Sequence, residues 1–422
     1  MSELATAARP RRVLMVTGAY FPEISSSGVQ CRNMARLLAG RAEVHVLTTA
    51  VDPRLPRHDS VDGVPVTRIR VDVRSVVSKV RAFRRMFLDL FRMVRQSDLV
   101  HLHGYSSKNV LVTAMARLFR KPIVLSLHTS GFDEPHVIAQ HGRLALWAFK
   151  AADLYLSVSR GLVDTYLAYG MPADRILEVP NGIDLDRFKP ATPEERGALR
   201  RRLNLPDGRP FDSPGGRARG TPTGLAQGRP VVMFVGFFSR DKQPRVLFDA
   251  WLQLTKHRGI ETTLVFVGAT KSAYFEVDDL IGDEMRRDAE AAGLSDRLIF
   301  TGSTHHVEDY FRAADLFVLP SKREGLPVAL LEAMACGLPS VASRLAGSTE
   351  TIIDDGVNGV LVPPGDHQAL AGAMASVLGD APLAAALSAA ARATVERRFA
   401  NADIADRWLD AYDLLAGFNS PA

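Results

Sequence analysis

Two glutamates lie eight residues apart in a mostly apolar stretch, Pro320 to Ser343, with the sequence PSKREGLPVALLEAMACGLPSVAS. Glu324 belongs to its polar beginning and Glu332 to its apolar middle. Between them, Gly325 and Pro327 are typical of a helix start, because a proline in the first turn loses no hydrogen bond. The sequence therefore predicts a short, buried helix that carries one carboxylate and begins beside another.

Two parts of this predicted helix could bind a ligand: the Glu332 carboxylate and the N–H groups of the first turn. A buried carboxylate is costly unless it is paired or hydrogen-bonded, so Glu332 needs a donor. Hydroxyl groups of a sugar or ribose would serve both glutamates, and the uncapped N–H groups of the first turn suit an anion such as a phosphate. Alternatively, Glu332 pairs with an arginine elsewhere and Glu324 is a solvated loop residue. Spacing alone leaves both interpretations open.

Further candidate residues lie where predicted strands end. His101 and His103 close one strand and His128 follows the next. Ligands of open α/β sheets bind beyond the carboxyl ends of strands, which favours His103 and His128 as site residues. The alternative is a hydrogen-bonded core residue for His101 and solvent-facing side chains for the other two. Gly28, just before a predicted helix, could let a ligand approach the backbone, or it simply makes a turn.

Two cations, Arg240 and Lys242, follow the first predicted strand of the second half of the chain. A cation in this loop can reach a ligand at the carboxyl edge of the sheet. For either residue alone, a surface salt bridge is an equally simple explanation.

The elements that would position these residues alternate between strands and helices. Predicted strands are 13–17, 43–47, 64–70, 98–102, 123–127, 154–158 and 176–179 in the first half, and 231–235, 262–267, 298–301 and 316–319 in the second. This alternation predicts parallel pairing and an α/β fold with two doubly wound, Rossmann-like domains. We expect domains at 1–185, with the C-terminal helix 402–416 packing back on it, and at 186–400, with a flexible Pro/Gly/Arg-rich insert at 206–230.

Length and composition fit two globular domains. The chain has 422 residues, more than one core usually spans, with 46% hydrophobic and 23% charged residues. Its two cysteines have no metal-like spacing, and neither a signal peptide nor a run of membrane-spanning length is evident, so we expect a cytoplasmic location. The net charge of +5 fits an anionic ligand or an acidic membrane surface. Nucleic acid is disfavoured, because no basic and aromatic residues interleave.

A basic amphipathic helix is predicted from Arg74 to Gln96. Apolar residues recur at helical spacing, and the remaining faces carry Lys79, Arg81, Arg84, Arg85, Arg92 and Arg95. Such a helix can lie on an anionic membrane, here the inner face. The alternative is an ordinary surface helix that packs on its own domain.

Several motifs in the second half occur together and in a fixed order. E-G-x-x-x-x-x-x-E followed by A-M-A-C-G-x-P spans Glu324 to Pro339; ADLFVLPS precedes it, and D-G-V-N-G-x-L-V-P-P-G-D follows. With NGIDLDRFKP at the end of the first domain, this pattern resembles family 4 of the retaining glycosyltransferases. The resemblance implies a GT-B fold, in which two Rossmann-like domains face each other across a cleft.

The resemblance also implies a function. A UDP or GDP sugar would bind the second domain, and a hexosyl residue would pass, with retention and without a metal or other cofactor, to a hydroxyl of a glycan or lipid-linked acceptor on the first. Catalytic roles are expected for His128, Lys242 and Glu324. Donor contacts are expected from Gly28, Arg240, Lys242, Glu324, Gly325, Leu326, Val328 and Glu332. Acceptor contacts are expected from His103 and Tyr105.

The chain departs from the family pattern at one position that matters. The family commonly has Gly-Arg after the first strand of the second domain, whereas Gly236 is followed here by Phe237. Arg240 could supply the guanidinium from a shifted position. The missing arginine also motivates a different hypothesis, a catalytically silent nucleotide-sugar-binding or scaffold protein. A third is a sugar-phosphate-forming enzyme of the same fold with a soluble acceptor.

Overall fold

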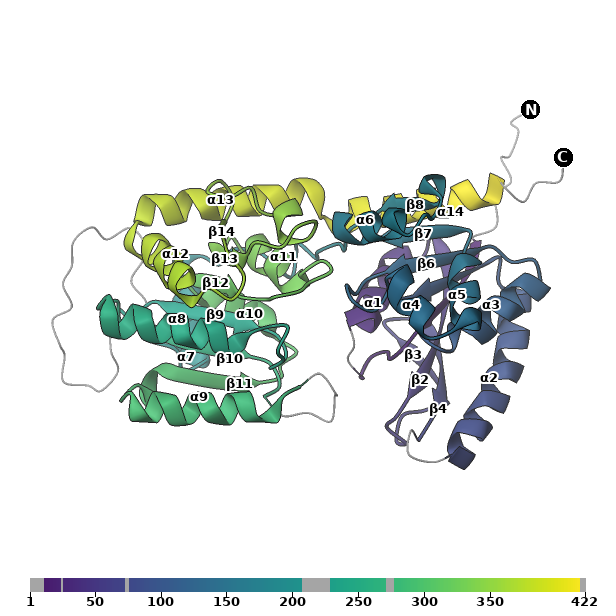
Figure 1. The fold of residues 1–422 in the computed structure, drawn as a ribbon, viewed down its shortest axis with the longest axis horizontal. Coiled ribbons are helices and arrows are strands. Elements are labelled where there is room, and N and C mark those ends of the chain that lie inside the picture. Colours follow the sequence, from purple (N-terminus) through teal and green to yellow (C-terminus); the bar gives the residue numbers. More distant parts are fainter. Residues whose placement is uncertain (1–10, 24–25, 73–75, 207–227, 271–276, 418–422) are drawn as a thin grey trace. The chain divides into compact units, whose positions relative to one another are not determined.

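The computed structural model describes residues 11–23, 26–72, 76–206, 228–270 and 277–417, which form two compact units (Figure 1). One unit comprises the described residues up to Asn181 together with those from Ala402 onward, and the other comprises those from Gly182 to Asn401. The insert expected at 206–230 lies almost entirely outside the described residues.

The first unit is built on an eight-stranded sheet in the order β3-β4-β2-β1-β5-β6-β7-β8. All neighbouring strands pair in parallel except β3 and β4, which are antiparallel. Its elements are β1 Arg11–Thr17, α1 Ser26–Leu38, β2 Ala42–Ala50, β3 His58–Val61, β4 Val64–Arg70, α2 Val76–Gln96, β5 Leu99–His103, α3 Asn109–Leu118, β6 Ile123–Leu127, α4 Pro135–Gln140, α5 Arg143–Lys150, β7 Leu154–Ser157, α6 Arg160–Ala168, the 3-10 helix η1 Ala173–Arg175, β8 Ile176–Glu178 and α14 Asn401–Gly417.

The last helix, α14, belongs to the core of this first unit. Trp408, Tyr412 and Leu415 are buried in the same apolar cluster as Met15 of β1 and Val124 of β6. The sheet on which α14 packs is covered on both faces, since every residue of β5 and β6 is buried. Parallel strands covered on both faces normally have such uninterrupted burial.

The second unit contains a six-stranded parallel sheet in the order β11-β10-β9-β12-β13-β14. Its apolar core gathers around side chains such as Phe234 of β9 and Trp251 of α8. Its elements are α7 Pro193–Arg202, β9 Val231–Val235, α8 Pro244–His257, β10 Thr263–Val267, α9 Asp279–Ala291, η2 Ser295–Arg297, β11 Leu298–Gly302, α10 Val307–Ala313, β12 Leu316–Leu319, α11 Val328–Ala335, β13 Ser340–Ser343, η3 Thr349–Thr351, β14 Val360–Val362, α12 His367–Gly379 and α13 Ala381–Arg398.

The predicted fold class, two doubly wound α/β domains, is confirmed, and the local differences have simple causes. Helix α1 begins at Ser26, so Gly28 lies in its first turn and not before it. The edge strand β3 was not predicted, because its sequence HDSV has no apolar run. Among the described helices, none alone is long and apolar enough to cross a membrane, while α12 and α13 meet those criteria only as a pair bent by 99°.

Candidate functional site

The carboxyl ends of β9 and β12 form the topological switch point of the second sheet, because β10 extends the sheet from β9 in one direction and β12 extends it in the other. The loop after β9 carries Lys242 and the loop after β12 carries Glu324. The Lys242 Nζ lies 2.7 and 2.8 Å from the two carboxylate oxygens of Glu324. The Ser321 hydroxyl donates to the same carboxylate at 2.7 Å. Ligands of doubly wound sheets bind at such a point.

Further contacts hold these two loops against each other. The backbone N–H of Lys322 donates to the Asp241 carbonyl at 2.7 Å, and the Arg323 guanidinium lies 2.5 Å from the Asp241 carboxylate. Gly268, directly after β10, allows the loop after β9 to approach closely. A Cβ atom at this position would lie 2.1 Å from the carbonyl oxygen of Gly236, so only glycine fits.

Helix α11 begins beside this ion pair and has no side-chain cap at Pro327. The first N–H groups of a helix have no partner within the helix, so those near Leu326 and Val328 can bind an acceptor from outside. The helix ends before Gly337, whose φ is 66°. The sequence prediction of a short apolar helix between Glu324 and Gly337 is therefore confirmed.

Glu332 lies inside α11 among buried neighbours, and burial raises the pKa of its carboxyl group to about 8. The positive charge of Arg187 acts against this change in pKa and Glu308 adds to it. Arg187 is paired with Glu308, at 2.7 Å. Among the described residues, the Glu332 carboxyl group forms no hydrogen bond or ion pair, so none of the described arginines is the partner that the alternative requires.

Arg240 is placed differently from Lys242. Its side chain is 91% exposed, and its Nε lies 3.7 Å from the Asp278 carboxylate. Lys242 is instead held against Glu324, with 30% of its side chain exposed. In this conformation Arg240 extends into solvent beside Asp278.

In the first unit, the three histidines at the ends of β5 and β6 stack. Ring centroids of His101 and His103 are 4.5 Å apart, and those of His103 and His128 are 5.7 Å apart. His101 is hydrogen-bonded through both nitrogens, to Tyr412 at 2.6 Å and to Ser126 at 2.7 Å. His101 is therefore the satisfied core residue that the sequence allowed.

His103 and His128 are buried, with exposures of 3% and 8%, so the alternative that they face solvent is wrong. Burial lowers the pKa of His128 to about 4 and that of His103 well below 6.5, so both rings are neutral at pH 7. No partner for their ring nitrogens occurs within the described ranges. Such buried, unpaired polar atoms are rare without a function or a ligand.

A residue that the sequence did not single out, Asp133, holds the backbone of His128 and of its neighbours in place. Its buried carboxylate accepts the backbone N–H groups of Tyr105 at 2.7 Å and of His128 and Thr129 at 2.8 Å each. Burial raises the pKa of Asp133, and these three hydrogen bonds act in the opposite direction. The Tyr105 hydroxyl is buried and has no partner among the described residues. Asp133 thus joins the loops after β5 and β6.

Lys108 is a second residue that the sequence analysis missed. Its Nζ donates to the carbonyl of Thr17 at 2.7 Å, at the end of β1, and lies 3.4 Å from the Thr49 hydroxyl. Burial lowers the pKa of Lys108 to about 8.

Across the described residues, no group of three or more His, Cys, Asp or Glu side chains is arranged to hold a metal ion.

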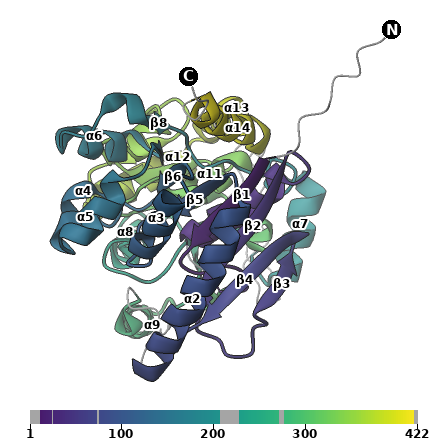
Figure 2. The same ribbon diagram turned by 90° about the vertical axis from the view of Figure 1, so that its right-hand side faces the viewer.

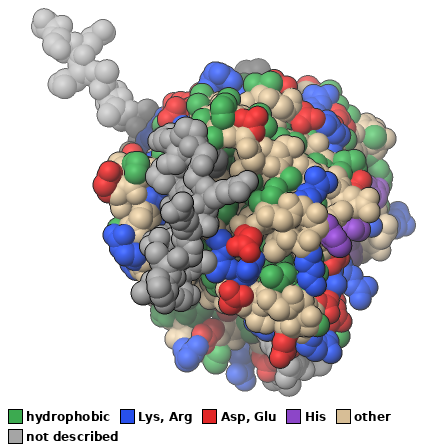
Figure 3. All heavy atoms as spheres, turned by 90° about the vertical axis from the view of Figure 1, so that its left-hand side faces the viewer, with side chains coloured by type: hydrophobic (Ala, Val, Ile, Leu, Met, Phe, Trp, Pro, Cys, Tyr) green, Lys and Arg blue, Asp and Glu red, His purple; other side chains and the backbone are tan. Residues whose placement is uncertain are grey.

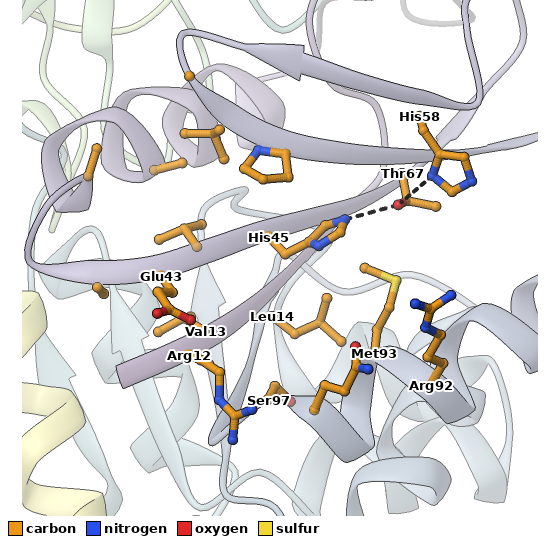
Figure 4. A pocket seen from close by; sticks show the side chains of 18 of the residues that line it. Arg12, Val13, Leu14, Glu43, His45, His58, Thr67, Arg92, Met93 and Ser97 are labelled. Carbon is orange, nitrogen blue, oxygen red and sulfur yellow. Dashed lines mark hydrogen bonds between the residues drawn. The ribbon is translucent and has the colours of Figure 1, made fainter. Parts of the chain in front are cut away.

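A cavity of about 630 Å³ lies elsewhere in the first unit, between the sheet and α2 (Figure 4). It borders the beginnings of β1, β2 and β4, the edge opposite to the one where ligands of such sheets bind. Its polar side chains are joined, since the Thr67 hydroxyl lies 3.0 Å from His45 Nε2 and 3.4 Å from His58 Nδ1. None of the residues predicted for the site lines this cavity.

Comparisons with known proteins agree with this architecture. A family model described as Glycosyltransferase Family 4 matches residues 27–187, and one described as Glycosyl transferases group 1 matches residues 221–394. A D-inositol 3-phosphate glycosyltransferase of Xylanimonas cellulosilytica is 30% identical over 90% of this chain and 89% of its own length. A 2-deoxystreptamine N-acetyl-D-glucosaminyltransferase of Streptomyces fradiae is 29% identical over 94% and 93%.

Among solved structures, Anabaena HepE in complex with UDP-glucose superposes with a TM-score of 0.74 at 21% identity, over 95% of this chain and 99% of that one. Sucrose-phosphate synthase of Thermosynechococcus elongatus gives a TM-score of 0.72 at 22% identity, over 97% and 100%. The chain therefore belongs to family 4 of the glycosyltransferases and has their GT-B fold.

Proposed function

We propose that the protein is a retaining hexosyltransferase that uses a UDP or GDP sugar, needs no metal ion or other cofactor, and transfers to a hydroxyl of a glycan or lipid-linked acceptor. The observation that carries this proposal is the Lys242–Glu324 pair at the switch point of the second sheet, directly before the uncapped start of α11. A cation, a carboxylate and free N–H groups together suit the diphosphate and the hydroxyls of a nucleotide sugar.

Each of these groups has a distinct part in the proposed transfer. Negative charge develops on the diphosphate as the bond to the sugar breaks, and Lys242 with the N–H groups of Leu326 and Val328 would stabilise it. Glu324 would exchange its contact with Lys242 for hydroxyls of the sugar. Glu332 would bind the ribose, and because its pKa is about 8 it can donate as well as accept a hydrogen bond.

On the first unit, the acceptor would bind at the carboxyl ends of β5 and β6. His103 and Tyr105 have buried polar atoms without partners in the described structure, which an acceptor hydroxyl could satisfy. His128 would contact the transferred sugar as a neutral ring, and Gly28 would let the donor approach the first turn of α1. In the same proposal, Arg240 turns away from Asp278 and contacts the diphosphate.

A small soluble acceptor is a second candidate beside the proposed glycan or lipid-linked acceptor. The names of the relatives, which include acceptors such as D-inositol 3-phosphate and 2-deoxystreptamine, favour a small soluble polyol. The basic, amphipathic helix α2 favours a lipid-linked acceptor and peripheral contact with the inner face of a membrane. A panel of both acceptor classes, assayed with each nucleotide sugar that the protein binds, separates these candidates.

The enzyme assignment is tested with Lys242→Ala and Glu324→Ala. Removing a group that stabilises developing charge typically costs about a hundredfold to a thousandfold in rate, so we expect a loss of this size in donor hydrolysis and transfer for Lys242→Ala. Glu324→Ala should also slow both reactions, because it removes the contact with the sugar hydroxyls. Lys256→Ala, on the exposed last turn of α8, is the matched control. If wild type binds donor, as seen in a raised melting temperature, but neither it nor the variants turn donor over, the silent-binding hypothesis is correct.

A further inference from the structure

The solvent-facing side of α2 exposes large apolar side chains. Their exposed fractions are 43% or more, from Val80 (57%), Phe83 (56%), Phe87 (43%), Leu88 (67%) and Phe91 (43%). In Figure 2 the helix lies at the front of the first unit, facing the viewer, and it packs against α3 and β4. Scattered exposed apolar residues need no explanation, but five on one face of one helix indicate a surface that contacts a partner.

The charges beside this apolar stripe are all positive. They belong to Arg81, Arg84, Arg85, Arg92 and Arg95. The helix contains a single acidic residue, Asp89, and its carboxylate already accepts two hydrogen bonds from Arg57, at 2.8 and 2.9 Å. The exposed side of α2 therefore offers a partner positive charge that no carboxylate of the helix neutralises.

Exposed apolar side chains and basic residues also occur on the neighbouring helices α3 and α5. Phe91 of α2 packs edge-on against Phe119 at the end of α3, with ring centroids 5.1 Å apart, and α3 packs in turn against α5. Leu118 is 67% exposed, and α5 exposes Leu144 (70%) and Trp147 (43%). Helices α3 and α5 contain no acidic residue and carry Arg143 and Lys150, besides Arg117, whose guanidinium pairs with Asp153 at 2.7 Å. We call the exposed side of α2, α3 and α5 the basic helical face.

We propose that the basic helical face docks on the surface of an anionic lipid bilayer, with the aromatic and leucine side chains entering the interface and the arginines contacting headgroup phosphates. Phenylalanine, leucine and tryptophan on one side and arginine on the other are the composition of helices that lie in a membrane interface. The face of the second unit in Figure 3 differs, because basic and acidic side chains are interspersed there. This docking deepens the proposed function by favouring its lipid-linked acceptor.

Vesicle co-sedimentation of the full chain tests the proposal. We expect binding to vesicles of phosphatidylcholine mixed with phosphatidylglycerol, little binding to phosphatidylcholine alone, and release by salt. Each basic residue near an anionic surface contributes roughly a fivefold gain, so combining Arg81→Glu, Arg84→Glu and Arg85→Glu should lower the partition coefficient on the order of a hundredfold or more. The matched control reverses three exposed arginines of the second unit: Arg201, Arg287 and Arg397.

The apolar contribution is tested separately with Leu88→Ser, for which Leu280→Ser is the control at an equal exposure of 67%. We expect weaker binding from the first variant only. Equal partitioning of the test and control variants, or no binding to anionic vesicles by wild type, would overturn the proposal. A concentration-dependent dimer that the Arg81, Arg84 and Arg85 reversals abolish would instead assign this face to a second copy of the chain. Donor hydrolysis in solution, measured on the same proteins, reports on the proposed function independently.

Discussion

The carboxyl group of Glu332 gives a prediction about stability that can be tested independently of the other site residues. Its carboxyl group lies within α11 without a partner among the described residues, and burial raises its pKa to about 8. Replacing it in Glu332→Gln keeps the shape of the side chain and removes its ability to ionise. The two proteins should therefore differ in stability in a way that depends on pH.

The size and direction of this difference follow from proton binding. Between the ordinary pKa of 4.5 and about 8, the folded protein keeps a proton that the unfolded chain has lost, so stability falls as pH rises through this range. At about 1.36 kcal/mol per unit of pKa, the complete effect would be about 5 kcal/mol. Part of Glu332 still reaches solvent, which screens the charge, so we expect on the order of 2 kcal/mol.

Urea denaturation of the wild type and of Glu332→Gln between about pH 5 and pH 9 measures this difference. The two proteins should be nearly equal in stability near pH 5, and the variant should be the more stable near pH 9, because only the wild type ionises a buried group. Glu284→Gln, on the exposed side of α9, should leave the pH dependence unchanged. A constant difference between wild type and Glu332→Gln across the range would refute a raised pKa at this position.

Two further substitutions test how the site is held in place. Gly268→Ala should destabilise the second unit by about 3 kcal/mol or more in urea denaturation, because its Cβ would lie 2.1 Å from the Gly236 carbonyl oxygen at a φ of 143°. Gly379→Ala, with nothing within 4 Å, should cost far less. Asp133→Asn should destabilise the first unit by about 2 kcal/mol, because one amide group cannot accept three N–H donors, whereas the exposed Asp174→Asn should be nearly neutral. Equal costs for each test and its control would contradict these assignments.

The local features of the proposed donor site were predictable because they are contiguous in the sequence. The start of α11, its apolar surface and the placement of Glu332 within it follow from a proline, a glycine and helical spacing over a few residues. Lys242 and Glu324 were each identified, but their contact was not predicted, since the two residues are 82 positions apart. Their pairing depends on β9 and β12 being neighbours in the sheet, which strand patterns alone do not specify.

The proposed acceptor site was harder to predict because burial there depends on distant parts of the chain. His103 lies against Trp408 of α14, with ring centroids 5.4 Å apart and the rings tilted by 39°. No pattern near His103 in the sequence indicates that a helix about 300 residues away covers it. Asp133 was missed for a related reason: its partners are backbone N–H groups on two loops, which leave no trace in residue type. Sequence patterns identify residues that bind through their side chains more readily than residues that position other loops.

The burial of the histidines also limits what His128 can do. A ring with a pKa of about 4 is neutral at pH 7, so it cannot supply the positive charge that stabilises a departing diphosphate. Lys242 is hydrogen-bonded to the carboxylate of Glu324 and remains partly exposed, so it can meet a ligand as a charged group. The two units therefore offer different chemistry: a neutral hydrogen-bonding ring on the first, and a cation with a carboxylate on the second. A mechanism that assigned charge stabilisation to His128 would require the ring to leave its buried stack.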